Sequence, residues 1–267
     1  MLLVREPEQA LEARAAVAGP VGNERVQAFP ADLTDPKAVE RFADTVLTNH
    51  PKIHGLVHCA GLLLPERSLG PAGIERMFAV EVLAPYLLSL RLLEGLRSGA
   101  PSRIVMVSGT GGLRLPGTRR RLEPENLQGE VSFHPLAHAR HLMLQRVLLA
   151  RELGRRLKGT GVGSLVVLPS VARTRYLRHC PTHLRLLARA LLLPGRATDP
   201  ELAASEIVHA AIDPGLEGAA GQYLVGIQEA VPPPPARDMA AANRLWHLLE
   251  ELSGVELDRE DSAAEGR

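Results

Sequence analysis

One stretch of this chain, from Leu136 to Ser170, constrains the fold more than any other. Its first part, to Lys158, mixes apolar and basic residues at a spacing typical of one long helix. Gly159 and Gly161 then mark a stop, and an apolar run follows that is typical of a buried strand. A long helix that leads directly into a buried strand predicts one unit of an alternating α/β fold.

The same alternation runs along the rest of the chain. Short apolar runs with strand character are separated by segments with helical spacing. Strands that alternate with helices pair in parallel through right-handed crossovers, and the helices cover both faces of the sheet. We therefore expect an α/β fold with a doubly wound, Rossmann-like parallel sheet. The expected strands are Leu2–Val4, Arg25–Phe29, Gly55–His58, Arg103–Val107, the run ending at Ser170, and Gln222–Val225.

Two helices carry distinctive local signals. Thr34 is the expected N-cap of a helix from Asp35 to about Thr48, because its hydroxyl can accept from a free amide of the first turn. The helix expected between Ala72 and Leu96 contains Pro85, which lacks a backbone donor and therefore interrupts it.

Length and composition bound the domain organisation and the class of partner. The chain has 267 residues, 45% of them hydrophobic, so it is long enough for one domain with a sizeable core. We expect a single domain over residues 1–252 and an acidic, disordered tail over residues 253–267. With 31 basic and 30 acidic residues the formal net charge is +1, which indicates no nucleic-acid partner.

Cysteine usage and hydropathy indicate the compartment. The only cysteines, Cys59 and Cys180, imply no disulfide framework, and Cys59 is expected to be a small buried residue. No stretch is long enough for a transmembrane helix, and the N-terminal apolar run is too short for a signal peptide. As written, the sequence predicts a soluble, cytoplasmic chain.

Several local motifs, taken with the order of strands, carry a family resemblance. The strands end at Asp32, at Cys59-Ala60-Gly61, at Ser108 and at Pro169. This order is similar to that of the short-chain dehydrogenase/reductase superfamily, and more narrowly it resembles the retinol dehydrogenase group. The resemblance covers Leu2 to about Leu252. The local matches are NLQGE (126–130), RELGRRLKGTGV (151–162), PSVARTRYLRH (169–179), EGAAGQY (217–223) and PARDMAAANRLW (235–246).

The resemblance implies a central first strand followed by a glycine-rich turn, T-G-x-x-x-G-I-G, that cradles the cofactor phosphates. This chain has no such segment, because Met1 falls at the position of the family's second strand. We therefore expect a sheet that lacks the first βα unit, so that the strand at Leu2–Val4 and the strand at Gly55–His58 have no common neighbour.

The family's catalytic positions have also changed. The family's Tyr-x-x-x-Lys falls at the start of the long helix, with the Tyr on His138 or Ala139 and the Lys on Leu142 or Met143. The second of the family's paired serines, which is the catalytic one, is a glycine at position 109, next to Ser108. The family's asparagine in the preceding helix falls on Glu81, within an apolar run.

What remains lies on the side of the cofactor. By position, Arg5 matches an arginine near the adenosine 2′-phosphate of NADP, and Asp32 matches the contact to adenine. Ala60 and Gly61 match a loop that approaches the cofactor closely, and Thr174 matches a hydroxyl beside the nicotinamide amide. The resemblance therefore implies NADP as the cofactor.

Two residues are candidates for catalysis. His138 could replace the tyrosine as a proton donor, since imidazole titrates near neutral pH; the alternative is a surface or pocket-lining histidine. Ser108 could orient a carbonyl group; the alternative is a serine that supports the loop. The spacing of His134, His138 and His141 on one helix could suit a metal, although we expect a solvated helix start and no metal.

The resemblance also bears on partners and location. The helix at 136–158 could form a homo- or heterodimer through its face at Leu144, Val147 and Leu148. The apolar and basic segment 183–193 matches a lid over lipophilic substrates and could contact a membrane surface. A longer form that carries a membrane anchor would be associated with the endoplasmic reticulum.

Two hypotheses of different classes follow. In the first, the chain is nominally an NADP-dependent oxidoreductase of lipophilic alcohols or carbonyls of the retinol/retinal type, impaired or inactive because its dyad is absent. In the second, it is a non-catalytic pseudoenzyme or a truncated isoform that acts through protein–protein contacts.

Overall fold

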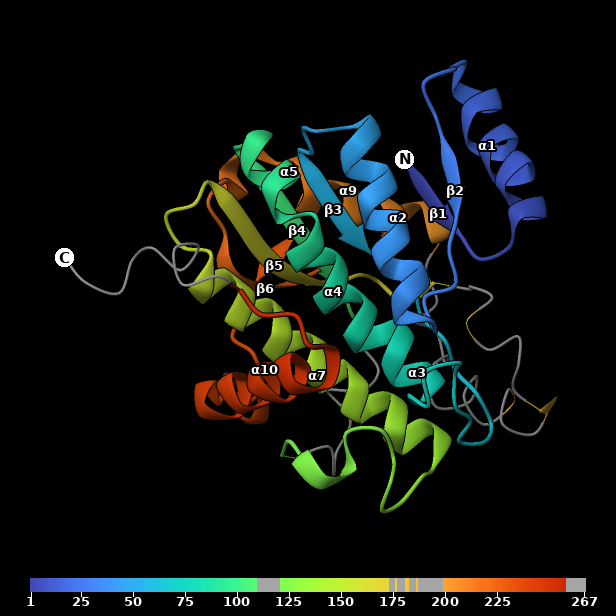
Figure 1. Ribbon diagram of the computed structural model, residues 1–267. Coiled ribbons are helices and arrows are strands. Elements are labelled where there is room, and N and C mark those ends of the chain that lie inside the picture. The colour runs from blue at the N-terminus through green and yellow to red at the C-terminus, as the bar shows by residue number, and fades with distance from the viewer. Residues whose placement is uncertain (110–120, 173–175, 177–180, 183–185, 187–198, 258–267) are drawn as a thin grey trace.

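The computed structural model describes residues 1–109, 121–172, 176, 181–182, 186 and 199–257. Its centre is a parallel sheet in the order β3-β4-β5-β6, to which β7 adds an antiparallel strand (Figure 1). A second, two-stranded parallel sheet joins β1 to β2. The expected α/β fold with a mostly parallel, Rossmann-like sheet is confirmed. The strands are β1 (Leu2–Val4), β2 (Ala28–Pro30), β3 (Gly55–His58), β4 (Ser102–Val107), β5 (Val162–Leu168), β6 (Ala220–Val225) and β7 (Gln228–Glu229).

Helices cover both faces of this sheet. In Figure 1, α2, α4 and α7 lie in front of the sheet and α9 lies behind it. The helices are α1 (Pro7–Val21), α2 (Pro36–Asn49), α3 (Arg76–Phe78), α4 (Ala84–Arg91), α5 (Leu93–Ser98), α7 (Pro135–Arg156), α9 (Pro200–Ile212) and α10 (Met239–Ser253). Shorter turns are the π-helical η1 (Ala79–Leu83) and the 3-10 turns η2 (Pro124–Asn126), η4 (Pro214–Leu216) and η5 (Pro234–Arg237).

The pleat of the central strands divides the core into two parts. Along β4, Ile104 and Met106 point to the larger cluster under α4 and α7, whereas Val105 points to the smaller cluster under α9. The neighbouring strand β5 divides in the same way, with Val166 in the larger cluster and Val167 in the smaller. Both strands are covered on both faces, which explains their continuous apolar character.

The long helix α7 is the centre of the larger cluster. Across it lies α10, whose Trp246 is fully buried and forms a T-shaped pair with Tyr86, with 5.0 Å between the two ring centroids. The guanidinium of Arg156, at the end of α7, lies over the same indole at 4.4 Å. Helix α7 is therefore held between the sheet and α10.

Pro85 interrupts the helical segment that runs from α3 through η1 into α4, as the sequence predicts. Because Pro85 has no N–H, the carbonyl of Glu81 loses its usual helical partner, and the turn at η1 widens into a π-helix. The helical segment starts at Arg76, after the N-cap Glu75, and not at about Ala72 as expected. The N-cap of α2 also differs: Asp35, not Thr34, accepts from the amide of Lys37.

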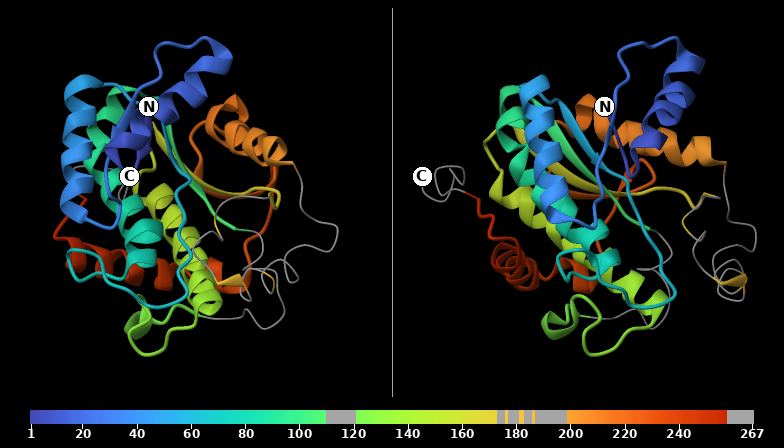
Figure 2. Two further views of the ribbon diagram at one scale, coloured as in Figure 1. Left: turned by 90° about the vertical axis from the view of Figure 1, so that its right-hand side faces the viewer. Right: turned by 45° about the vertical axis from the view of Figure 1, so that its right-hand side comes forward.

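The two sheets meet without a shared strand. Figures 1 and 2 show the β1–β2 pair and α1 beside β3, and among the described residues no strand pairs with both β1 and β3. The Arg103 amide donates to His54, so the backbone groups of Gly55 and Val57 face away from β4, toward the open edge of β3. The Val57 side chain at this edge is 41% exposed.

Candidate functional site

The residues singled out from the sequence gather where parallel strands end. Asp32 follows β2, Ala60 and Gly61 follow β3, and Ser108 follows β4. The carboxyl ends of parallel strands lie at one edge of a sheet, and this edge is where doubly wound folds bind their ligands. Thr174 lies outside the described residues, as do most of the expected lid at 183–193 and most of the tail at 253–267.

At one end of this edge, two predicted cofactor residues contact each other. The Arg5 guanidinium lies 3.9 Å from the Asp32 carboxylate and 3.1 Å from that of Glu6. Asp32 also accepts hydrogen bonds from the amide and the hydroxyl of Thr34, at 2.9 Å each. The Arg5 side chain is 49% exposed, so it can turn toward an anion in solvent.

The loop after β3 is held from below by one arginine of α7. Arg146 donates through Nη2 to the carbonyl of His58 (2.8 Å) and through Nη1 to that of Ala60 (3.2 Å). The side chain is only 5% exposed, and its Nη1 lies 3.6 Å from Oε2 of the equally buried Glu81. A buried guanidinium requires such an anionic partner, because an isolated charge is costly to remove from water.

Glu81 completes this arrangement from the π-helical turn η1. Its Oε1 accepts from the amide of Leu62 (3.1 Å) and from the hydroxyl of Tyr176 (3.3 Å). Burial raises the pKa of the Glu81 carboxyl above its usual range, and the nearby Arg146 opposes that shift. We call Glu81, Arg146 and the backbone groups of residues 58, 60 and 62 the loop clamp.

His58 points inward from the same strand end and is fixed as a neutral ring. The hydroxyl of Ser89 donates to the carbonyl of Pro85 (2.6 Å), so its oxygen accepts from Nε2 of His58 (3.1 Å). Burial, with a smaller contribution from Arg146, lowers the pKa of His58 from 6.5 to about 3.

Tyr176 covers the outer side of the same loop. A Cβ atom built on Gly61 would lie 3.1 Å from Cε2 and 3.3 Å from Cδ2 of the Tyr176 ring, and 3.8 Å from Oε1 of Glu81. The space into which a side chain of residue 61 would point is therefore already filled.

Cys59, expected to be buried, is in fact exposed.

The catalytic positions of the resemblance meet at the end of β4. A Cβ atom on Gly109 would lie 2.7 Å from Cε of Met143, so Met143 packs against the position of the missing serine. Ala139 lies one helical turn earlier on α7, which favours Ala139 and Met143 as the pair that replaces the Tyr and the Lys. The hydroxyl oxygen of Ser108 is buried and has no hydrogen-bond partner among the residues that the structure describes.

His138, the other candidate position for the tyrosine, belongs to a different group of residues. Its Nε2 lies 3.0 Å from Oε2 of Glu75, and both side chains are almost wholly buried. The Glu75 carboxylate also accepts from the amides of Met77 (3.0 Å) and Phe78 (2.8 Å). Since the carboxylate already accepts from these two amides, Nε2 of His138 is the donor in this pair.

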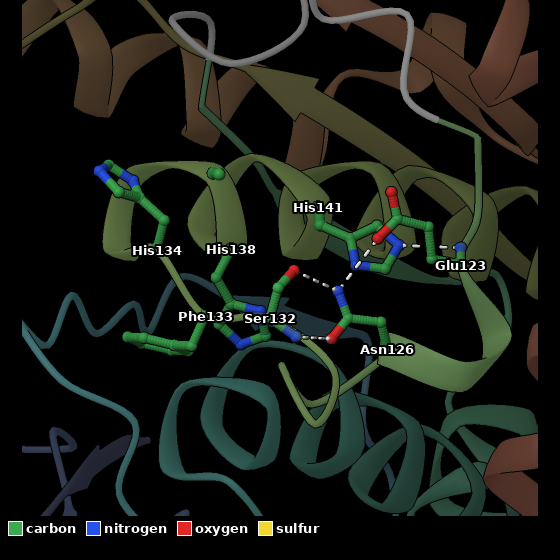
Figure 3. Close-up of a pocket in the computed structure, with 8 residues that line it drawn as sticks. Glu123, Asn126, Ser132, Phe133, His134, His138 and His141 are labelled. Carbon is green, nitrogen blue, oxygen red and sulfur yellow. Dashed lines mark hydrogen bonds between the residues drawn. The ribbon is translucent and has the colours of Figure 1, made fainter.

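His138 also lines a small cavity of about 100 Å³ at the N-terminal end of α7 (Figure 3). The polar groups around it largely satisfy one another: Nε2 of His141 accepts from the amide of Glu123, and Asn126 binds Glu123 and Ser132. Within the described part of the chain, no cluster of three or more His, Cys, Asp or Glu residues is arranged to hold a metal ion.

The proposed dimer face of α7 needs a correction. Leu144, Val147 and Leu148 are at most 3% exposed and pack inside the chain's own core. The three side chains are therefore not available to a partner, because the core of the same chain already covers them. A dimer through another part of this helix stays a prediction.

The fold and the position of the candidate residues define a class of protein: a Rossmann-like α/β domain with its site at the carboxyl ends of parallel strands. The model of the family described as short chain dehydrogenase matches residues 1–118. Bovine retinol dehydrogenase 12 is 33% identical over 234 residues, which cover 87% of this chain and 71% of that protein. The chain belongs to the short-chain dehydrogenase/reductase superfamily and, within it, to the retinol dehydrogenase-like group.

Other relatives and solved structures agree. Human retinol dehydrogenase 12 is 32% identical, over 87% of this chain and 71% of its own length. A protein of Mycobacterium paratuberculosis shares the fold with a TM-score of 0.67 and 24% identity, over 96% of this chain and 84% of that one. A short chain dehydrogenase from Burkholderia cenocepacia, solved in complex with NADP, gives a TM-score of 0.60 at 20% identity, over 84% of each chain.

Use of a nicotinamide cofactor is a property of this family, but the two ends of the site fit it unequally. At Arg5 and Asp32, an exposed cation stands at the edge of the sheet, where a phosphate could reach it. At Gly61, the ring of Tyr176 fills the space that a closely approaching cofactor would use. The residues therefore fit the adenosine end and do not fit the end near the chemistry.

Three of these groups are not predicted by the sequence: Arg146, Glu75 and Tyr176. The sequence does carry one sign of the Glu81–Arg146 pair, because each of the two residues interrupts an apolar run. Two opposite charges on buried helix faces are expected to pair with each other. Nothing in the sequence indicates that Tyr176 returns to Gly61.

No helix in the described part of the chain is both long and apolar enough to cross a membrane.

Proposed function

We propose that this chain is a retinol-dehydrogenase-like, nominally NADP-dependent oxidoreductase of lipophilic alcohols and carbonyls whose turnover is strongly impaired. The observation that carries the proposal is the contact of Met143 with Gly109, with Ala139 one turn earlier. Reduction of a carbonyl needs a group that gives a proton to the substrate oxygen, and none of these three side chains titrates. His138, the candidate proton donor, is bonded through Nε2 to the buried carboxylate of Glu75.

The finer parts of the proposal have separate support. The exposed Arg5 at the end of β1 favours the 2′-phosphate of NADP, because an arginine binds phosphate through several parallel donors. The names of the relatives favour a lipophilic alcohol or aldehyde such as retinol or retinal. In a form that carries an anchor, the protein would be associated with the endoplasmic reticulum.

Oxidation of NADPH in the presence of all-trans-retinal tests this function. We expect the purified chain to be slower than bovine retinol dehydrogenase 12, assayed beside it, by at least about 100-fold, the usual contribution of a positioned acid–base group. The variant with Gly109→Ser, Ala139→Tyr and Met143→Lys is the matched comparison. Equal rates for the unmodified chain and the bovine enzyme would contradict the proposal.

A second candidate is a non-catalytic role through protein–protein contact. The observation that favours it is the open edge of β3, where the backbone groups of Gly55 and Val57 face outward. Leu11 of α1 is 76% exposed and Ile212 of α9 is 72% exposed. Unpaired strand edges pair readily with other chains. Sedimentation equilibrium tests it, because Val57→Lys should reduce association and Leu252→Lys, on α10, should not.

A further inference from the structure

The two ends of the predicted cofactor site differ in how open they are to a ligand. At the first end, Arg5 and Asp32 are paired at the surface, and their side chains are 49% and 36% exposed. At the second end, the loop after β3 is contacted on both sides by side chains of other elements. The first end needs only the rearrangement of a surface ion pair, which costs little because solvent screens it.

The inner side of the second end is fixed by the loop clamp. Arg146 donates to the carbonyls of His58 and Ala60, and Glu81 accepts from the amide of Leu62. The three backbone groups alternate along the loop, so they lie on the same side of an extended backbone. If the loop moved inward, it would separate the buried Arg146 from Glu81 and leave a buried charge without its partner. The loop therefore cannot make room for a ligand on its inner side.

The outer side is covered by Tyr176. Its ring occupies the direction of a Cβ atom on Gly61, and its hydroxyl donates to Oε1 of Glu81 at 3.3 Å. A glycine at such a position normally allows a ligand to approach the backbone. Here an aromatic ring of the same chain makes that approach, and the clamp residue Glu81 holds it there.

We infer that Tyr176 closes this end of the site, and that a dinucleotide reaches Gly61 only when the ring has left it. The inference rests on the proposed function for the class of ligand, a nicotinamide dinucleotide. Its consequence is selectivity by length. A ligand confined to the Arg5–Asp32 end, such as adenosine 2′,5′-bisphosphate, does not meet the ring. NADPH must displace the ring, so its affinity falls as the fraction of molecules with the ring at Gly61 rises.

A tyrosine near the site of chemistry has a second possible use, as a replacement proton donor. The geometry favours closure, because the hydroxyl is already bonded to a buried carboxyl group and the ring lies where the ligand would stand. The two roles differ in one respect: a proton donor needs its hydroxyl, whereas a ring that blocks the site does not.

Calorimetric titration of the full chain with NADPH and with adenosine 2′,5′-bisphosphate tests the inference. For NADPH, Tyr176→Ala should bind roughly tenfold tighter than the unmodified chain, because the closed population is removed. Tyr176→Phe should gain less than Tyr176→Ala, because it removes the hydrogen bond to Glu81 but keeps the ring that blocks the site. Tyr86→Phe is the matched control, since it removes the hydroxyl of a tyrosine that bonds to Val255 elsewhere. The bisphosphate should bind all four proteins equally.

Each other result overturns the inference in a recognisable way. Equal NADPH affinity in all four proteins would show that Tyr176 does not close the site, while leaving the proposed cofactor in place. Binding of the bisphosphate but of no NADPH, even by Tyr176→Ala, would show that something else excludes the dinucleotide. Failure of every protein to bind either ligand would overturn the inference together with the NADP part of the proposed function. Loss of retinal turnover in Tyr176→Phe would make the hydroxyl a proton donor instead.

Discussion

Replacing His58 with glutamine should make the chain more resistant to mild acid. The folded protein holds His58 neutral, with its pKa lowered from 6.5 to about 3 by burial. In the unfolded chain the ring takes up a proton near pH 6.5. Stability from this group is therefore complete above about pH 6.5 and is lost as the pH falls toward 3.

The magnitude follows from the size of that shift. The difference between 6.5 and 3 is 3.5, which at about 1.36 kcal/mol per pH unit corresponds to about 5 kcal/mol over the whole range. At pH 4.5 the loss should be about 3 kcal/mol. A domain of this kind has a total stability of roughly 5–15 kcal/mol, so this loss is readily measured.

The assay is urea unfolding of the unmodified chain and of His58→Gln at several values between pH 8 and pH 4.5. Glutamine does not titrate, and its amide can still donate to the Ser89 oxygen that His58 contacts. The difference in unfolding free energy between the two proteins should change by about 1.4 kcal/mol per pH unit below pH 6.5. His54→Gln is the matched control, because His54 is exposed on the same segment. A difference that stays constant from pH 8 to pH 4.5 would refute the reasoning.

Three further predictions concern stability. Trp246→Ala should cost about 3–5 kcal/mol in urea unfolding, because the side chain is fully buried; a loss below 1 kcal/mol would contradict the packing described. Arg146→Met should cost about 3–5 kcal/mol and Glu81→Gln less, and the double variant should recover part of the loss if the two charges are paired. Gly109→Ser should destabilise by about 1–3 kcal/mol in thermal unfolding, and adding Met143→Ala should relieve that cost, because the new side chain would stand 2.7 Å from Met143.

Much of the fold was predictable, because apolar spacing determines it locally. The strand at Gly55–His58 lies where the sequence predicts it, and the long helix predicted from Leu136 is α7. Helix starts were less predictable where two capping residues compete, as Thr34 and Asp35 do.

The site was only partly predictable, since its groups come from distant segments. Ser108 and Gly61 follow strands and could be placed at one edge of a sheet from their order alone. The pairing of His138 with Glu75 and the return of Tyr176 to Gly61 depend on how helices and loops cross in space. No local spacing records such contacts, because the partners lie 63 and 115 residues apart in the printed sequence.

The separation of β1 and β2 from the central sheet has a consequence for how cooperatively the chain unfolds. The segment β1-α1-β2 makes most of its contacts within itself, and its ladder hydrogen bonds join only its own two strands. A segment tied to the rest by so few contacts can open while the five-stranded sheet stays folded. Native-state hydrogen exchange should therefore divide the molecule into two units, with amides of β1 and β2 exchanging through a partial opening and those of β4 and β5 only through global unfolding.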